Sequence, residues 1–166
     1  MKLVCVEPRR LAMFSRRDSS LLKEISERTN TTMRIVDDNI EIQGEAANDY
    51  FAELVINAIC LGFESRKAFK LLNDEYFLEV IDLKQVVSRN EKRVTQYKAR
   101  LIGSEGKARK TLEELSGALL SIWGNKIAVI GKYDEIKNVK EAIKMLLEGR
   151  KHIGVYAFLE RKQRNF

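Results

Sequence analysis

Apolar residues in the second half of the chain recur at two spacings that alternate. Between 134 and 147 they return every three to four residues, which predicts a long helix. Two short apolar runs, 118–123 and 127–131, lie on either side of a turn at Gly124 and predict a β-hairpin. A further apolar run at 77–83 predicts the strand that leads this segment.

The first half of the chain repeats the pattern. We predict a strand that ends at Pro8, because proline has no N–H for a strand ladder. A short helix, a second helix with an apolar stripe, a hairpin that turns at Asp37-Asp38 and a long helix follow. The strand is predicted over residues 2–7, the two helices over 9–14 and from Leu21, the hairpin over 31–43 and the long helix over 45–60.

The stretch between 99 and 110 contains two glycines, Gly103 and Gly106, that bracket two polar residues. It predicts a helix, a tight turn and a second helix beginning at Lys107. Such a helix start presents free N–H groups and a positive dipole end, which favour a phosphate. The G-x-x-G loop of KH domains clamps about four nucleotides of single-stranded RNA in this way. The spacing alone is equally compatible with an ordinary interhelical turn.

The order of the surrounding elements favours the KH interpretation. A strand, a helix, the glycine loop, a helix, two strands and a helix make a type I, or eukaryotic-type, KH domain. This is an α+β fold in which a three-stranded sheet packs against helices. A last helix, 149–162, is predicted beyond it, with Tyr156 and Leu159 packed back and a basic end.

An internal repeat runs through the chain with an offset of 87 residues. The offset brings like residues together without a gap over about forty positions. The matched pairs are Gly44 with Gly131, Glu27 with Glu114, Ile35 with Ile122, Ile40 with Ile127, Ile56 with Ile143, and Gly62 with Gly149. The chain is therefore predicted to hold two tandem type I KH domains, each with a three-stranded sheet packed against helices.

We place the domains at 1–73 and 74–166. The first is a degenerate KH domain that ends in a helical connector from residue 63, and the second carries the G-x-x-G loop and the C-terminal helix. The offset aligns Arg16-Arg17-Asp18-Ser19 with the glycine loop, so the first domain lacks both glycines. It is either a packing and docking module or a weak RNA contact through Arg16 and Arg17.

The predicted RNA groove lies between the two helices at the glycine loop and the strand 119–123. The apolar floor for the bases is predicted to consist of Leu101, Ile102, Leu120 and Ile122, and room for the RNA backbone comes from Gly103 and Gly106. Ser104 is predicted to contact phosphate, and positive charge comes from Arg100, Lys107, Arg109 and Lys110. Glu105 is predicted to point away from the RNA. Trp123 either stacks a base or belongs to the core.

The positive charge is confined to two segments, although the net charge of the chain is only +6. Residues 91–111 hold seven Lys or Arg against two Glu, and 150–166 hold five against one. The rest of the chain is net acidic. Confinement of this kind favours an electrostatic footprint for phosphate over uniformly solvated helix faces.

Other function classes find little support. No apolar run reaches membrane-spanning length and the start does not resemble a signal peptide, so we expect a cytoplasmic protein with no membrane partner. No nucleophile elbow, metal-ligand set or P-loop is present, so we expect no enzyme, cofactor or metal site. Cys5 and Cys60 have no metal-ligand spacing and are expected to be buried thiols, and His152 has no partner ligand.

Three stretches together resemble the archaeal two-KH ribosome-biogenesis proteins, the counterparts of the eukaryotic small-subunit assembly factor "partner of Nob". They are Glu79-Val80-Ile81-Asp82-Leu83, Arg100-Leu101-Ile102-Gly103-Ser104-Glu105-Gly106, and His152-Ile153-Gly154-Val155-Tyr156-Ala157-Phe158-Leu159-Glu160-Arg161-Lys162. The connector 71–76 adds to the resemblance. The family commonly keeps a glycine loop in its first domain and a basic residue at the position of Ser104, and this chain departs from it at both.

The resemblance implies a non-enzymatic factor that binds single-stranded RNA near the 3′ end of small-subunit ribosomal RNA. It also implies two protein partners: the PIN-domain nuclease that matures that end and the alpha subunit of initiation factor two. The alternative is a protein-interaction scaffold in which both KH units are structural, linked to translation initiation through that alpha subunit. The degenerate first loop and Glu105 favour this alternative.

Overall fold

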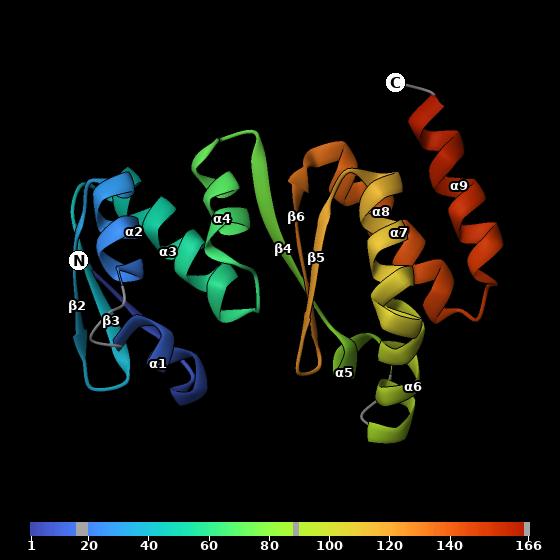
Figure 1. Cartoon of the computed structure of the whole chain (residues 1–166), viewed down its shortest axis with the longest axis horizontal. Helices are drawn as coiled ribbons and strands as arrows, with labels where there is room; N and C mark the ends of the chain where they lie inside the picture. The colour runs from blue at the N-terminus through green and yellow to red at the C-terminus, as the bar shows by residue number, and fades with distance from the viewer. Residues whose placement is uncertain (16–19, 88–89, 165–166) are drawn as a thin grey trace. The chain divides into compact units, whose positions relative to one another are not determined.

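The structure is a computed structural model that describes residues 1–15, 20–87 and 90–164. The chain forms two compact units, Met1–Asn73 and Asp74–Phe166 (Figure 1). Each unit contains a three-stranded antiparallel sheet with helices on one face, so the predicted α+β class is confirmed.

The first unit begins with a strand and two helices, followed by a hairpin and a long helix. Its elements are β1 (Lys2–Cys5), α1 (Pro8–Ser15), α2 (Leu21–Thr29), β2 (Thr32–Val36), β3 (Asn39–Gln43) and α3 (Ala46–Cys60). The strand order is β1-β3-β2, with Val4 opposite Ile40 and Ile35 also opposite Ile40 across the central strand. Ile40 and Ile42 are completely buried beneath the helices.

A short helical segment closes the first unit. It consists of α4 (Ser65–Ala68) and the 3-10 helix η1 (Phe69–Leu72), both of which contact α3. Gly62, at φ 103°, ends the long helix before this segment, and Leu71 is completely buried. The helical connector predicted from residue 63 is therefore present.

The second unit also has a strand, two helices, a hairpin and a long helix in this order. Its elements are β4 (Tyr76–Asp82), α5 (Leu83–Val86), α6 (Glu91–Ile102), η2 (Ser104–Gly106), α7 (Lys107–Ser116), β5 (Leu119–Trp123), β6 (Lys126–Lys132), α8 (Tyr133–Leu147) and α9 (His152–Arg164). The strand order is β4-β6-β5, which places β4 and β5 at opposite edges of the sheet. Of the elements that follow β4, α5 has no counterpart in the described residues between β1 and α1.

The core of the second unit lies between the sheet and its helices. Ile127 and Val129 of β6 pack with Leu112 of α7 and Ile143 of α8, all of them buried. The helix α9 packs against α7 and α8. Its contact includes Tyr156, whose pKa is raised by burial while a hydrogen bond to Thr111 opposes the shift.

The offset of 87 residues seen in the sequence also relates the elements. The helices α3 and α8 are both 15 residues long and begin at Ala46 and Tyr133, one offset apart. The strands β2 and β5 correspond in the same way. On the N-terminal side of the first helix of each unit the offset no longer holds, because β4 is longer than β1 and α5 lies between β4 and α6.

The two cysteines lie at the ends of regular elements, Cys5 at the end of β1 and Cys60 at the end of α3. Cys5 is exposed, so its prediction as a buried thiol is wrong: along β1 the inward position is Val4, and alternate residues of a strand point to opposite faces. Cys60 is half-buried at the end of α3. In the described part of the chain, no helix is long and apolar enough to cross a membrane.

Candidate nucleic-acid interface

The glycine loop joins two helices through three residues in left-handed or glycine-specific backbone conformations. Gly103 has φ 72° and ψ 177°, and its N–H donates to the carbonyl of Ala99 at 2.8 Å, which ends α6. Gly106 has φ 76°, and its N–H donates to the Gly103 carbonyl at 3.3 Å. Glu105 lies between them at φ 56°, although it carries a side chain. The turn is therefore tight and closes on itself.

The two glycines are required for different reasons. A Cβ added to Gly103 would lie 2.7 Å from the Cβ and 2.8 Å from the backbone nitrogen of Ala108, so only glycine fits there. A Cβ added to Gly106 would meet nothing within 4 Å. The space beside Gly106 is thus open, as required where a sugar-phosphate backbone approaches the loop.

The open side of the loop adjoins the start of α7. This helix begins at Lys107, as predicted, and no described side chain caps its first turn. Its orphan N–H groups and dipole favour an anion there. Ser104, Lys107 and Lys110 are exposed, and neither lysine forms an ion pair with another described residue. Glu105 is exposed as well.

A third cation of this region, Arg109, forms an ion pair with an acidic neighbour. Its Nη1 lies 2.6 Å from Oε1 of Glu113 one turn later on α7, and the two side chains are 27% and 14% exposed. The other oxygen of Glu113 accepts a hydrogen bond of 3.0 Å from the backbone N–H of Leu120 in β5. Glu113 therefore links α7 to the strand edge and offsets much of the charge of Arg109.

The predicted contact Arg100 has a role inside the fold. Its guanidinium donates to the carbonyls of Leu146, in α8, and Arg150, just after it, at 2.6 Å each. The carbonyl of Arg100 in turn lies 2.9 Å from Nε2 of His152, at the start of α9. Arg100 joins α6 to the following helices.

The apolar floor is smaller than the sequence suggests. Leu101 and Leu120 are 2% and 4% exposed and belong to the core, because they lie on the inward faces of α6 and β5. Ile102 and Ile122 are half-buried and remain accessible to a base. Trp123 is half-buried at the end of β5, so its exposure is compatible with both stacking and packing.

Glu113 is the site residue that sequence reasoning missed. A signal was present, because Arg109 and Glu113 are four residues apart on a predicted helix and such pairs face each other. The contact to β5 could not be anticipated from spacing. Arg16 and Arg17, predicted as a weak RNA contact, lie outside the described residues. Among the described residues, no group of three or more His, Cys, Asp or Glu side chains is placed to hold a metal ion.

The glycine loop and its helices fall within a match to a known family. The model for the eukaryotic type KH domain (KH domain type I) matches residues 77–164. A KH domain-containing protein of Methanocaldococcus jannaschii is 42% identical over 109 residues, which cover 66% of this chain and 48% of that relative. The pre-rRNA-processing protein PNO1 of Debaryomyces hansenii is 27% identical over 105 residues, 63% of this chain and 41% of the relative. The match thus spans less than half the length of these curated relatives.

Solved structures match almost the whole chain. Dim2p from Pyrococcus horikoshii is 32% identical with a TM-score of 0.86, and the match covers 96% of this chain and 98% of that one. A chain in the a/eIF2alpha-aDim2p-rRNA complex from the same organism is 30% identical with a TM-score of 0.89, covering 99% and 94%. A protein of unknown function from Aeropyrum pernix is 36% identical with a TM-score of 0.90, covering 99% and 90%.

Proposed function

We propose that the second unit of this chain clamps single-stranded RNA at the G-x-x-G loop. The chain belongs to the type I KH family and is an archaeal counterpart of the PNO1 and Dim2p proteins. This relationship supports a role as an RNA-binding factor of ribosome biogenesis. The target is the region near the 3′ end of small-subunit ribosomal RNA. The factor acts by binding, without catalysis of its own.

The observation that carries this proposal is the open space at Gly106 beside the uncapped start of α7. A Cβ at Gly106 would meet no atom within 4 Å beyond its chain neighbours, so a nucleic-acid backbone has room beside the loop, where free N–H groups can receive a phosphate. Lys107 and Lys110, which form no ion pair with a described residue, supply positive charge at the same end of the helix. Ile102 and Ile122 supply the accessible apolar surface for bases.

The first unit is proposed to be a degenerate KH domain spanning 1–73. Its sheet order, β1-β3-β2, is that of the second unit, and its elements α2, β2, β3 and α3 follow the offset of 87 residues. A packing or protein-docking role is favoured because the sequence has no glycines where the second unit has its loop.

Two protein partners are proposed. The alpha subunit of initiation factor two is supported by a solved complex in which a similar chain accompanies a/eIF2alpha and rRNA. The PIN-domain nuclease that matures the RNA end rests on the resemblance to the "partner of Nob" family alone.

Fluorescence anisotropy tests the RNA target. A labelled oligonucleotide that copies the 3′ end of small-subunit ribosomal RNA is titrated with the full chain, against a scrambled oligonucleotide of equal composition. Preference for the natural sequence supports the proposal. Equal weak binding to both would contradict it and favour the second candidate.

That second candidate is a protein-interaction scaffold with structural KH units. The ion pair of Arg109 with Glu113 favours it, since this pair removes one cation from the RNA surface, and the exposed Glu105 repels phosphate. Binding to the alpha subunit without sequence-dependent RNA binding distinguishes this candidate from the first.

A further inference from the structure

The helix α9 contributes to the family resemblance through its sequence, but the proposed RNA clamp uses none of its residues. It packs against α7 and α8. Its Val155 and Leu159 are buried and belong to the core of the second unit. Since both side chains lie in that core, α9 is an integral part of the unit rather than a loose extension.

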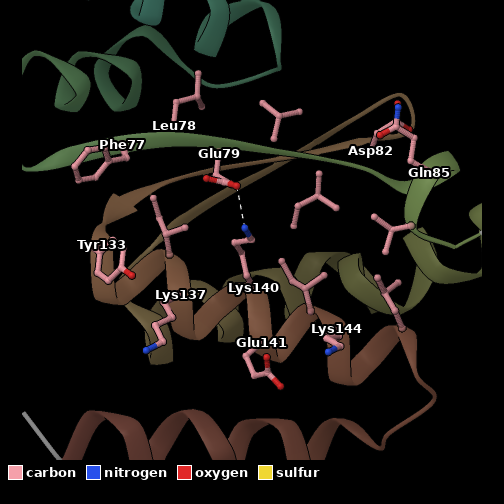
Figure 2. Close-up of a pocket in the computed structure, with 16 residues that line it drawn as sticks. Phe77, Leu78, Glu79, Asp82, Gln85, Tyr133, Lys137, Lys140, Glu141 and Lys144 are labelled. Carbon is pink, nitrogen blue, oxygen red and sulfur yellow. Dashed lines mark hydrogen bonds and ion pairs between the residues drawn. The ribbon is translucent and has the colours of Figure 1, made fainter.

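The helix α8 lies between the sheet and α9. Val139 and Ile143 of α8 are buried in the core with residues of β6. Figure 2 shows the side of α8 that faces the sheet, where Nζ of Lys140 lies 2.8 Å from Oε1 of Glu79 in β4 across a groove of about 760 Å³. At the bottom of the same view, α9 runs along the other side of α8. The position of α9 is therefore set through α8 by the core of the unit.

The first turn of α9 is bonded to the end of α6. Nε2 of His152 lies 2.9 Å from the carbonyl oxygen of Arg100. Arg100 precedes Gly103 by three residues, and its carbonyl is one of the last four of α6, which have no N–H partner inside the helix. Because a carbonyl oxygen only accepts, His152 donates through Nε2. The bond holds the last turn of α6, directly before the glycine loop, against α9.

One turn later, α9 is bonded to α7 on the other side of the loop. The hydroxyl of Tyr156 is hydrogen-bonded to the side chain of Thr111, whose Oγ1 donates to the carbonyl of Lys107 at 2.8 Å. Since Thr111 gives its only hydroxyl proton to that carbonyl, Tyr156 is the donor in the bond to Thr111. Lys107 is the first residue of α7 and directly follows Gly106. The bond therefore holds the N-terminal half of α7 against α9.

Both hydrogen bonds start from one face of α9. His152 and Tyr156 are four residues apart, and their ring centroids are separated by 6.0 Å. The glycine loop lies between the two segments that they bind. It closes through the N–H of Gly106, which donates to the carbonyl of Gly103 at 3.3 Å, longer than a usual hydrogen bond of this kind. A loop closed by so long a bond depends on its flanking helices for its shape.

We infer that His152 and Tyr156 are positioning residues of the RNA clamp: they hold the end of α6 and the N-terminal half of α7 against one turn of α9, and so fix the glycine loop in the conformation that receives the RNA backbone. Neither side chain touches RNA in this account. A loop that is ordered before RNA arrives spares the complex the cost of ordering it on binding. The inference rests on the proposed function, since it assigns these residues to the clamp at Gly106.

The test measures the affinity of the full chain for the labelled 3′-end oligonucleotide by fluorescence anisotropy. Tyr156→Phe removes the hydroxyl and keeps the ring, and Tyr133→Phe, at an exposed tyrosine of α8, is the matched control. His152→Ala removes the donor to Arg100. His152→Gln tests rescue, because the glutamine amide also carries an N–H donor. Circular dichroism confirms that each variant folds.

We expect Tyr156→Phe and His152→Ala each to weaken RNA binding by about two- to tenfold, the effect of losing one hydrogen bond. His152→Gln should recover most of the affinity, and Tyr133→Phe should bind like the wild type. The salt dependence of binding should stay unchanged, since no phosphate contact is removed. In the free protein, amide hydrogen exchange at residues 103–107 should be faster in both weakened variants.

Two results would overturn the inference while the clamp itself stands. Wild-type affinity in both Tyr156→Phe and His152→Ala, whatever their free energies of unfolding, would leave α9 as a packing element only. Weaker binding with unchanged hydrogen exchange in the loop would mean that these side chains touch RNA directly. If the wild type does not bind the oligonucleotide, the proposed function fails and the inference fails with it.

Discussion

Arg109 and Glu113 form a part-buried ion pair of 2.6 Å on α7, and Glu113 also binds the backbone N–H of Leu120 at the edge of β5. This arrangement places an anion between the glycine loop helix and the strand that borders the predicted RNA groove. Of the cations proposed to bind RNA, Arg109 is thus the one already neutralised within the protein. Within the proposed RNA site, Glu113 lowers the positive charge that is free to meet phosphate.

Replacement of Glu113 by Gln should therefore raise the affinity for RNA. The amide keeps an acceptor for the Leu120 N–H, while Arg109 is released to face phosphate. Part-exposed ion pairs contribute roughly 0.2 to 1 kcal/mol, so the gain should be at most about fivefold. Anisotropy titration measures it, and Glu114→Gln, an exposed acidic position next in sequence, is the control. Weaker binding by Glu113→Gln would show that the carboxylate itself is needed.

Lys107 and Lys110 should account for the salt dependence of binding. Each phosphate contact to a single strand contributes a slope of about −0.7 to log K against log salt. Lys107→Gln and Lys110→Gln should each reduce the slope by up to about that amount. Lys126→Gln, an exposed lysine at the hairpin, serves for comparison. A slope that neither substitution changes would place the phosphate contacts elsewhere.

Loss of Arg100 should lower stability more than RNA binding. Arg100→Ala removes donors to the carbonyl of Leu146 in α8 and to that of Arg150 after the helix, and each charged hydrogen bond contributes roughly 1.5 to 3 kcal/mol. Chemical denaturation should show a clear loss in the free energy of unfolding. Lys110→Ala, which lacks such contacts, should leave that free energy unchanged. A stable Arg100→Ala protein with lost RNA binding would restore Arg100 to the RNA surface.

The two cysteines should differ in reactivity. Burial raises the pKa of the Cys60 thiol from 9.0 to about 11, while Arg10 opposes the shift, so at pH 8 this thiol is protonated and shielded. Iodoacetamide should label Cys5 and spare Cys60, as read by mass spectrometry. The stability that Cys60 contributes is complete below pH 9 and declines as the pH rises toward 11, because the unfolded thiol ionises first. Rapid labelling of Cys60 at pH 8 would contradict this.

The sequence was sufficient where local chemistry decides the structure. Gly103 and Gly106 predicted the loop, and the offset from Gly44 to Gly131 predicted matching elements in the two units. It was insufficient where long-range packing decides. No spacing revealed that Arg100 binds carbonyls 46 and 50 residues away, or that Leu120 points into the core. The exposed Cys5 shows the same limit, because an apolar run does not tell which face of an edge strand is covered.

Alanine substitutions at the two glycines of the loop should lower the free energy of unfolding by different amounts. Gly103→Ala places a Cβ 2.7 Å from Ala108 at φ 72°, which should lower the free energy of unfolding by roughly 2 to 4 kcal/mol. Gly106→Ala meets no atom within 4 Å and should cost only roughly 1 to 2 kcal/mol for its φ of 76°. Thermal denaturation compares the two. Equal losses would mean that Gly106 has a packing role that its open surroundings do not indicate.

The most direct test of the RNA clamp is the affinity of Gly106→Asp for the 3′-end oligonucleotide. Aspartate tolerates the left-handed conformation better than most residues, and its Cβ has open space, so the fold should persist by circular dichroism. Its carboxylate would lie where we place a phosphate, and Gly106→Asn separates shape from charge. We predict loss of binding by the aspartate variant and a smaller loss by the asparagine variant. A folded Gly106→Asp protein that binds RNA like the wild type would contradict the clamp.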